Sequence, residues 1–135
     1  MDLMRKPLEG LLHEGIKVIG SVRDVSEAFE RHRVFVAPLR YGAGIKGKVV
    51  MALCNGIPTV LTQVATEGMS VRDGQEVLLA DTPGQFAEAV VELHENTARW
   101  EAISQAALNF GRTTFGAERA REVLRKIILE LGITI

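Results

Sequence analysis

Residues 34–62 constrain the fold of this chain most, because they follow the order strand, glycine-rich turn, helix, strand. The apolar run 34–37 ends at a proline and is typical of a buried strand. Three glycines follow, and residues 49–54 then predict a helix that ends at an Asn-Gly pair. A second buried strand is expected at 59–62. This order indicates a βαβ unit whose first loop opens a helix N-terminus at the carboxyl edge of a parallel sheet, where α/β folds bind ligands.

The rest of the chain continues the alternation of helices and strands. It predicts helices at 5–14 and 24–31, a strand at 16–19 between them, and a last strand at 77–80. Three helices fill the remainder, the second capped by Thr97. The last helix carries a one-sided apolar stripe of Ala120, Val123, Leu124, Ile127, Ile128 and Leu131. We therefore expect an α/β fold with a parallel sheet of about four strands, in which residues 16–19 pair with residues 34–37.

Composition excludes several classes of protein. At 135 residues the chain is expected to be a single domain, residues 1–135, and its net charge of −1 gives no general attraction to nucleic acid or membranes. One cysteine and three histidines without metal-ligand spacing predict no metal site. Polar and turn residues interrupt the uncharged stretch 49–66, which therefore predicts helix, turn and strand rather than a transmembrane segment. No signal peptide is predicted, and we expect a cytoplasmic protein with no cofactor.

The glycine turn matches two phosphate-binding patterns in part. Gly42, Gly44 and Gly47 fit the dinucleotide pattern G-x-G-x-x-G, and Glu67 follows at about the right distance for a ribose-binding acid, although within a loop. Gly42 and Gly47 with Lys48 also fit most of a P-loop, but the next residue is Val49, where a hydroxyl must bind magnesium. Both patterns are weak on their own.

A longer resemblance covers about residues 15–130. The stretch 38–62, Pro-Leu-Arg-Tyr-Gly-Ala-Gly-Ile-Lys-Gly-Lys-Val-Val-Met-Ala-Leu-Cys-Asn-Gly-Ile-Pro-Thr-Val-Leu-Thr, resembles the donor-binding motif of retaining GT-B group 1 glycosyltransferases. The likeness continues upstream in 18–24 and downstream in 66–68 and 73–80. It implies a Rossmann-like domain that binds a nucleotide diphosphate sugar, with the glycine turn facing the phosphates.

The resemblance also suggests which side chains face the donor. Lys46, together with Arg40 and Lys48, would hold phosphate charge through charge-assisted hydrogen bonds. The alternative for these cations is a solvated helix start, although cations oppose the dipole there. The donor-site candidates are Val22, Arg23, Arg40, Gly42, Ala43, Gly44, Ile45, Lys46, Lys48, Met51 and Glu67. Catalytic residues are not assigned.

Two departures from the family pattern shape the functional prediction. Ala43 and Met51 stand where the family often has a pair of glutamates, and the thioether of Met51 is a poor partner for ribose hydroxyls. The chain also has no room for the N-terminal, acceptor-binding domain of a complete enzyme. We therefore expect the donor-binding part of a glycosyltransferase, inactive alone, and a homodimer that covers exposed apolar surface. The alternatives are a non-catalytic interaction module with a decayed site, or a dinucleotide-binding domain.

Overall fold

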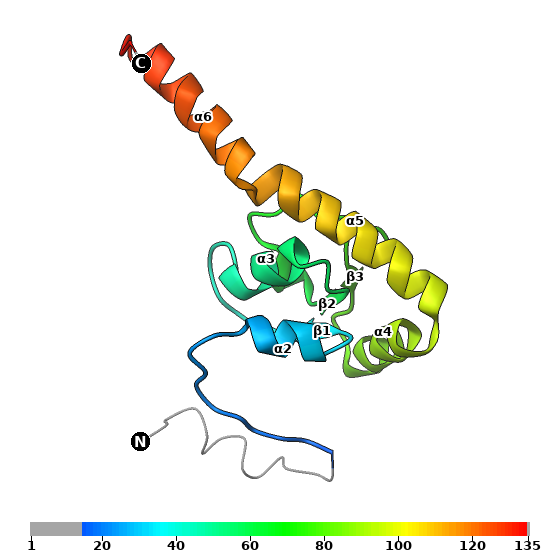
Figure 1. Ribbon diagram of the computed structural model, residues 1–135. Helices are drawn as coiled ribbons and strands as arrows, with labels where there is room; N and C mark the ends of the chain where they lie inside the picture. Colours follow the sequence, from blue (N-terminus) through cyan, green and yellow to red (C-terminus); the bar gives the residue numbers. More distant parts are fainter. Residues whose placement is uncertain (1–14, 135) are drawn as a thin grey trace.

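The computed structural model describes residues 15–134 (Figure 1). The predicted helix 5–14 lies outside the described residues. One parallel sheet, in the order β1-β2-β3, is built from β1 (Phe35–Ala37), β2 (Thr59–Leu61) and β3 (Leu78–Leu79). The predicted α/β fold with a parallel sheet is confirmed, and each strand lies within its predicted range.

Helices connect and cover the strands. In chain order they are α2 (Ser26–Arg31), α3 (Gly47–Cys54), the 3-10 turn η1 (Gln63–Thr66), α4 (Pro83–Glu95), α5 (Thr97–Phe115) and α6 (Ala117–Glu130). Helix α3 begins two residues earlier than predicted and ends as predicted, with Gly56 in the left-handed region at φ 67°. The cap of α5 is Asn96 rather than Thr97, because the Asn96 side chain accepts the Arg99 N–H at 3.0 Å.

The prediction of a strand at 16–19 is wrong, so the described sheet has three strands rather than about four. Ile16 and Ile19 are 56% and 62% exposed, on a coil that runs away from the sheet (Figure 1). The physical reason lies in the connection to β1. Its only helix, α2, has six residues and is about 9 Å long, whereas a four-residue strand spans about 13 Å. Such a helix is too short to cover a fourth strand.

The central strand, β2, is buried on both faces of the sheet. In β2 the side chains of Val60 and Leu61 are fully buried and belong to two different core clusters, as the alternation of a strand requires. Leu61 packs in the cluster with Leu53 of α3, and Val60 packs in the cluster with Leu93 of α4. Helix α5 contributes to both clusters, so it fixes the position of α3 relative to the sheet.

The loop after η1 is held by an ion pair. Glu76 is 4% exposed and accepts hydrogen bonds from the Arg72 backbone N–H at 2.8 Å and from Arg72 Nε at 3.2 Å. Hydrogen bonding from the Arg72 side chain lowers the pKa of the Glu76 carboxyl below its usual range, against the opposing effect of burial. Because the carboxylate is ionised and paired, it holds residues 72–76 together just before β3.

Helix α6 projects from the body of the molecule (Figure 1). The predicted apolar stripe is present, but Leu124, Ile127 and Leu131 are 58%, 46% and 69% exposed. Within the described part of the chain, α5 is the element that α6 packs against most. The apolar pattern thus marks a face that the described residues leave open to solvent.

Candidate functional site

The glycine turn lies between β1 and α3, at the carboxyl end of the first strand. Gly42 and Gly44 have φ of 133° and 77°, values that side-chain-bearing residues rarely adopt. The turn leads directly into α3, whose N-cap residue, Lys46, makes no side-chain capping bond. An N-terminus of this kind offers backbone N–H groups and a positive dipole end to an anion.

The Gly44 N–H and the Lys46 ammonium both point at the carboxylate of Glu67. The Gly44 N–H donates to Glu67 Oε2 at 2.8 Å, and the Lys46 ammonium lies 3.5 Å from the same oxygen and also bonds to the Gly44 carbonyl. The Lys46 side chain is 15% exposed, whereas that of Glu67 is 54% exposed. Lys46 therefore folds back under the turn, while Glu67 approaches it from the solvent side.

Gly68 allows the turn to approach the loop that carries Glu67. Its φ is 77°, and a Cβ at this position would lie 2.7 Å from Cγ1 of Ile45, closer than side chains pack. Ile45 thus rests on the backbone of Gly68, next to Glu67. The sequence alone does not predict this contact. The only sequence signal for it is the glycine at position 68, directly after Glu67.

A hollow lies at the carboxyl edge of the sheet. Residues that follow β1, β2 and β3 meet there with the start of α4, and the lining residues are Pro38, Arg40, Thr62, Ala80, Asp81, Thr82, Pro83, Phe86 and Ala87. Asp81 accepts the Gln63 N–H at 2.9 Å, which joins the ends of β2 and β3. The edge of a parallel sheet where the strands end is where open α/β folds hold their ligands.

Comparison with known proteins gives the same family as the sequence motifs. Residues 2–96 match the family model described as "Glycosyl transferases group 1". The chain belongs to this family. It is also similar to an uncharacterized 44.6 kDa protein in the cps region of Klebsiella pneumoniae, with 22% identity over 99 residues. That match covers 73% of this chain and 26% of the relative, so the chain spans about a quarter of the relative's length.

The resemblance to group 1 glycosyltransferases is therefore confirmed, and the structure distributes the predicted donor residues over several places. Gly42, Gly44, Ile45, Lys46 and Glu67 come together at the turn, and Arg40 lines the hollow beside it. Ala43 lies within the same turn.

The other predicted donor residues lie elsewhere. Lys48 lines a different, apolar hollow between α2, β1 and α3. Met51 is 40% exposed on α3, and Val22, 45% exposed, precedes α2 in a coil with Arg23.

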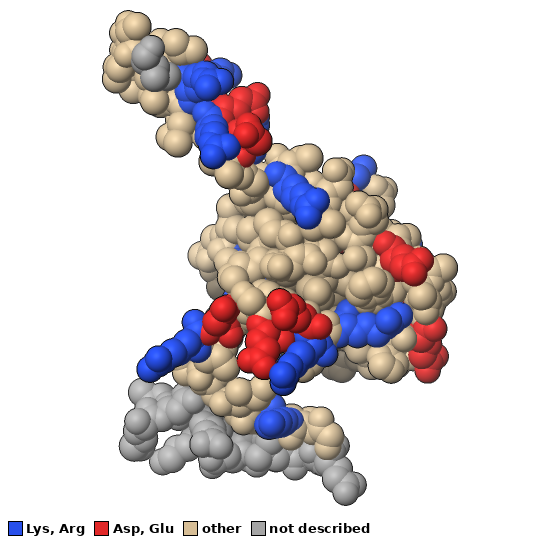
Figure 2. All heavy atoms as spheres, in the orientation of Figure 1, with Lys and Arg blue, Asp and Glu red and all other residues tan. Residues whose placement is uncertain are grey.

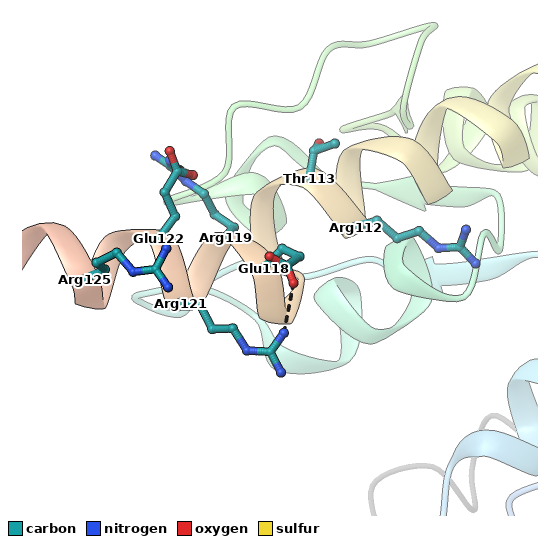
Figure 3. Close-up of a pocket in the computed structure, with 7 residues that line it drawn as sticks. All are labelled: Arg112, Thr113, Glu118, Arg119, Arg121, Glu122 and Arg125. Carbon is teal, nitrogen blue, oxygen red and sulfur yellow. Dashed lines mark hydrogen bonds and ion pairs between the residues drawn. The ribbon is translucent and has the colours of Figure 1, made fainter. Parts of the chain in front are cut away.

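A further hollow lies where α5 meets α6 (Figure 3). Four arginines and two glutamates line it with Thr113: Arg112, Arg119, Arg121, Arg125, Glu118 and Glu122. Arg121 pairs with Glu118 at 2.9 Å and Arg119 with Glu122 at 2.8 Å, all on exposed helix surface. Charges of both signs also lie side by side on the face seen in Figure 2. The junction is thus a solvated face on which acidic and basic side chains alternate.

The described residues form neither a metal-binding cluster nor a membrane-spanning helix. Among residues 15–134, no group of three His, Cys, Asp or Glu side chains is placed to share a metal ion. In the same part of the chain, no helix combines the length and the apolar character needed to cross a membrane.

Proposed function

We propose that this chain is the donor-binding part of a group 1 glycosyltransferase and that its glycine turn holds the diphosphate of a nucleotide sugar. The observation that carries the proposal is the convergence of the Gly44 N–H and the Lys46 ammonium on a single anionic oxygen of Glu67. A phosphate oxygen in that place would accept the same two bonds, one of them charge-assisted. The dipole of α3 would add to the attraction.

The neighbouring hollow suits the remainder of the donor. It begins at the ends of all three strands and contains Arg40, a second cation, beside the apolar surface of Phe86 and Pro83. A site with one apolar wall and a few polar groups fits a nucleoside better than a simple anion. Sugar transfer to an acceptor would also need an acceptor-binding domain, which we propose as the partner of this one.

A second candidate is a non-catalytic interaction module with the same fold. Met51 favours it, because this exposed thioether stands where a ribose-binding glutamate is common in the family. The two candidates differ in one property, since only the first requires binding of nucleoside diphosphates.

We predict weak binding of nucleoside diphosphates that depends on Lys46. Titrating UDP, GDP and ADP by calorimetry should give millimolar or somewhat tighter dissociation constants for the best of the three. Lys46→Met keeps the packed methylene chain and removes the charge, and should weaken binding about tenfold or more. Lys126→Met, which removes an exposed charge on α6, is the matched control and should bind as the wild type does.

Two results would contradict the donor site. One is no binding of any nucleotide at millimolar concentration, and the other is equal binding by Lys46→Met and wild type. A preference for NAD over all three nucleotides would support a dinucleotide-binding domain instead. Circular dichroism of each variant checks that the fold is retained.

We also predict that the isolated chain forms a homodimer through α6. A helix of 14 residues is about 21 Å long and is marginal in water without a packing partner. Pairing two copies would cover Leu124 and Ile127 on both. Light scattering should show a dimer for wild type, and Leu124→Gln with Ile127→Gln should weaken it at least about tenfold. Glu122→Gln, on the polar face of α6, should leave the dimer intact. A wild-type monomer at high concentration would refute the dimer prediction.

A cytoplasmic location also stays a prediction.

A further inference from the structure

The carboxylate of Glu67 accepts the hydrogen bonds that the proposed function assigns to the diphosphate, from the Gly44 N–H and the Lys46 ammonium. We infer that Glu67 is an internal competitor at the glycine turn: it accepts the bonds of Gly44 and Lys46 and must swing away when a diphosphate binds. The inference rests on the proposed function and deepens it by naming the residue that sets the affinity of the site.

The geometry makes the Glu67 side chain, and not the turn, the moving part. Lys46 is 15% exposed and tied to the Gly44 carbonyl, so its ammonium stays in place. Glu67 is 54% exposed, so its carboxylate can rotate into water without burying charge. Its backbone cannot follow far, because the next residue, Gly68, is in close contact with Ile45. The competitor is therefore a mobile side chain on a backbone that stays in place.

Electrostatics makes simultaneous occupancy unfavourable. Glu67 Oε2 lies 2.8 Å from the Gly44 nitrogen and 3.5 Å from Lys46 Nζ, the distances at which a phosphate oxygen would sit. Two anions a few ångströms apart repel, and the repulsion grows as water is excluded from between them. The Gly44 amide has a single N–H and can donate it fully to only one anion. A diphosphate must therefore replace the carboxylate, which weakens binding.

The test compares Glu67→Gln with wild type by calorimetry, using inorganic pyrophosphate and the best-binding nucleoside diphosphate. Gln has nearly the same shape and can still accept the Gly44 N–H, but it carries no charge. We expect about tenfold tighter binding of both ligands. Glu92→Gln is the matched control, because Glu92 also pairs with a cation, Arg99, at 2.9 Å but lies on α4. It should bind as the wild type does.

Each other outcome overturns part of the account. Binding by wild type without tightening in Glu67→Gln overturns the inference and leaves the proposed function standing. Tightening for the nucleotide but not for pyrophosphate also overturns it, because the competition would then lie away from the diphosphate. If wild type and Glu67→Gln both fail to bind either ligand, the proposed function fails together with the inference.

A ligand-free measurement tests the contact itself. Glu67→Ala should speed hydrogen exchange at the Gly44 amide, which loses its acceptor, while amides in the middle of α5 keep their wild-type rates. Unchanged exchange at Gly44 would show that Glu67 does not hold the turn. That result would overturn the inference whatever the binding data show.

Discussion

Gly111→Ala is expected to destabilise the protein by about 2 kcal/mol or more, although alanine is the better helix former. Gly111 is buried in α5, where the helix crosses α3. A Cβ at this position would lie 2.7 Å from the Cys54 nitrogen, 2.8 Å from Cys54 Cα and 2.9 Å from the Leu53 carbonyl carbon. These are backbone atoms of α3, so no side-chain rotation can relieve the clash. The two helices would have to separate, which would loosen the contact that positions α3 and its N-terminus.

Gly84→Ala is the matched control for this prediction. Gly84 lies in the first turn of α4, and a Cβ there would have no atom within 4 Å. The same substitution should therefore be neutral or stabilising, by up to about 1 kcal/mol. Urea denaturation measures both variants. Gly111→Ala as stable as wild type would mean that α3 and α5 do not approach as closely as the structure shows.

The central βαβ unit is predictable from sequence because local chemistry sets each boundary. A proline follows β1, Gly42 and Gly44 have φ values that favour glycine, and Gly56 follows the end of α3 in a left-handed conformation. These features need no knowledge of distant residues.

The errors arise where a segment depends on a partner elsewhere. Residues 16–19 have the composition of a strand, but a strand also needs a neighbour and a covering helix, and α2 is too short to cover it. The stripe on α6 correctly predicts an apolar helix face, yet no pattern states what covers it. Close approaches such as that of Gly111 to α3 depend on how two helices cross, and the sequence does not encode this locally.

For the candidate site, the sequence predicts which residues lie at the turn but not the contacts between them. Family resemblance places Lys46 and Glu67 near the donor, and the structure brings both to the turn. The bond from the Gly44 N–H to Glu67 joins residues 23 positions apart, so spacing alone does not reveal it. The hollow lined by Arg40 and Asp81 likewise exists only because three parallel strands end at one edge. Lys48 shows the limit of motif spacing, because it lies only two residues after Lys46 and yet lines another hollow, between α2, β1 and α3.

The pure 135-residue chain is expected to show no sugar transfer, which is the largest effect on activity that we predict. We propose that the glycine turn and the hollow position the donor, whereas the proposed acceptor-binding partner domain would orient the acceptor against it. Orientation of two reactants contributes about 7–11 kcal/mol to catalysis, and closure over the site excludes water. Without acceptor orientation and closure over the site, any reaction of a bound nucleotide sugar should be slow hydrolysis.

Incubation with radiolabelled UDP- and GDP-sugars and a panel of sugar acceptors tests this expectation, with separation of labelled transfer products from free sugar. Lys46→Met is the control for contaminating host enzymes, because transfer that persists in that variant does not come from this site. Transfer by wild type that Lys46→Met abolishes would contradict the prediction and show a complete active site within this chain. Slow hydrolysis lost in the same variant would instead support donor binding, because it requires the glycine turn but no acceptor.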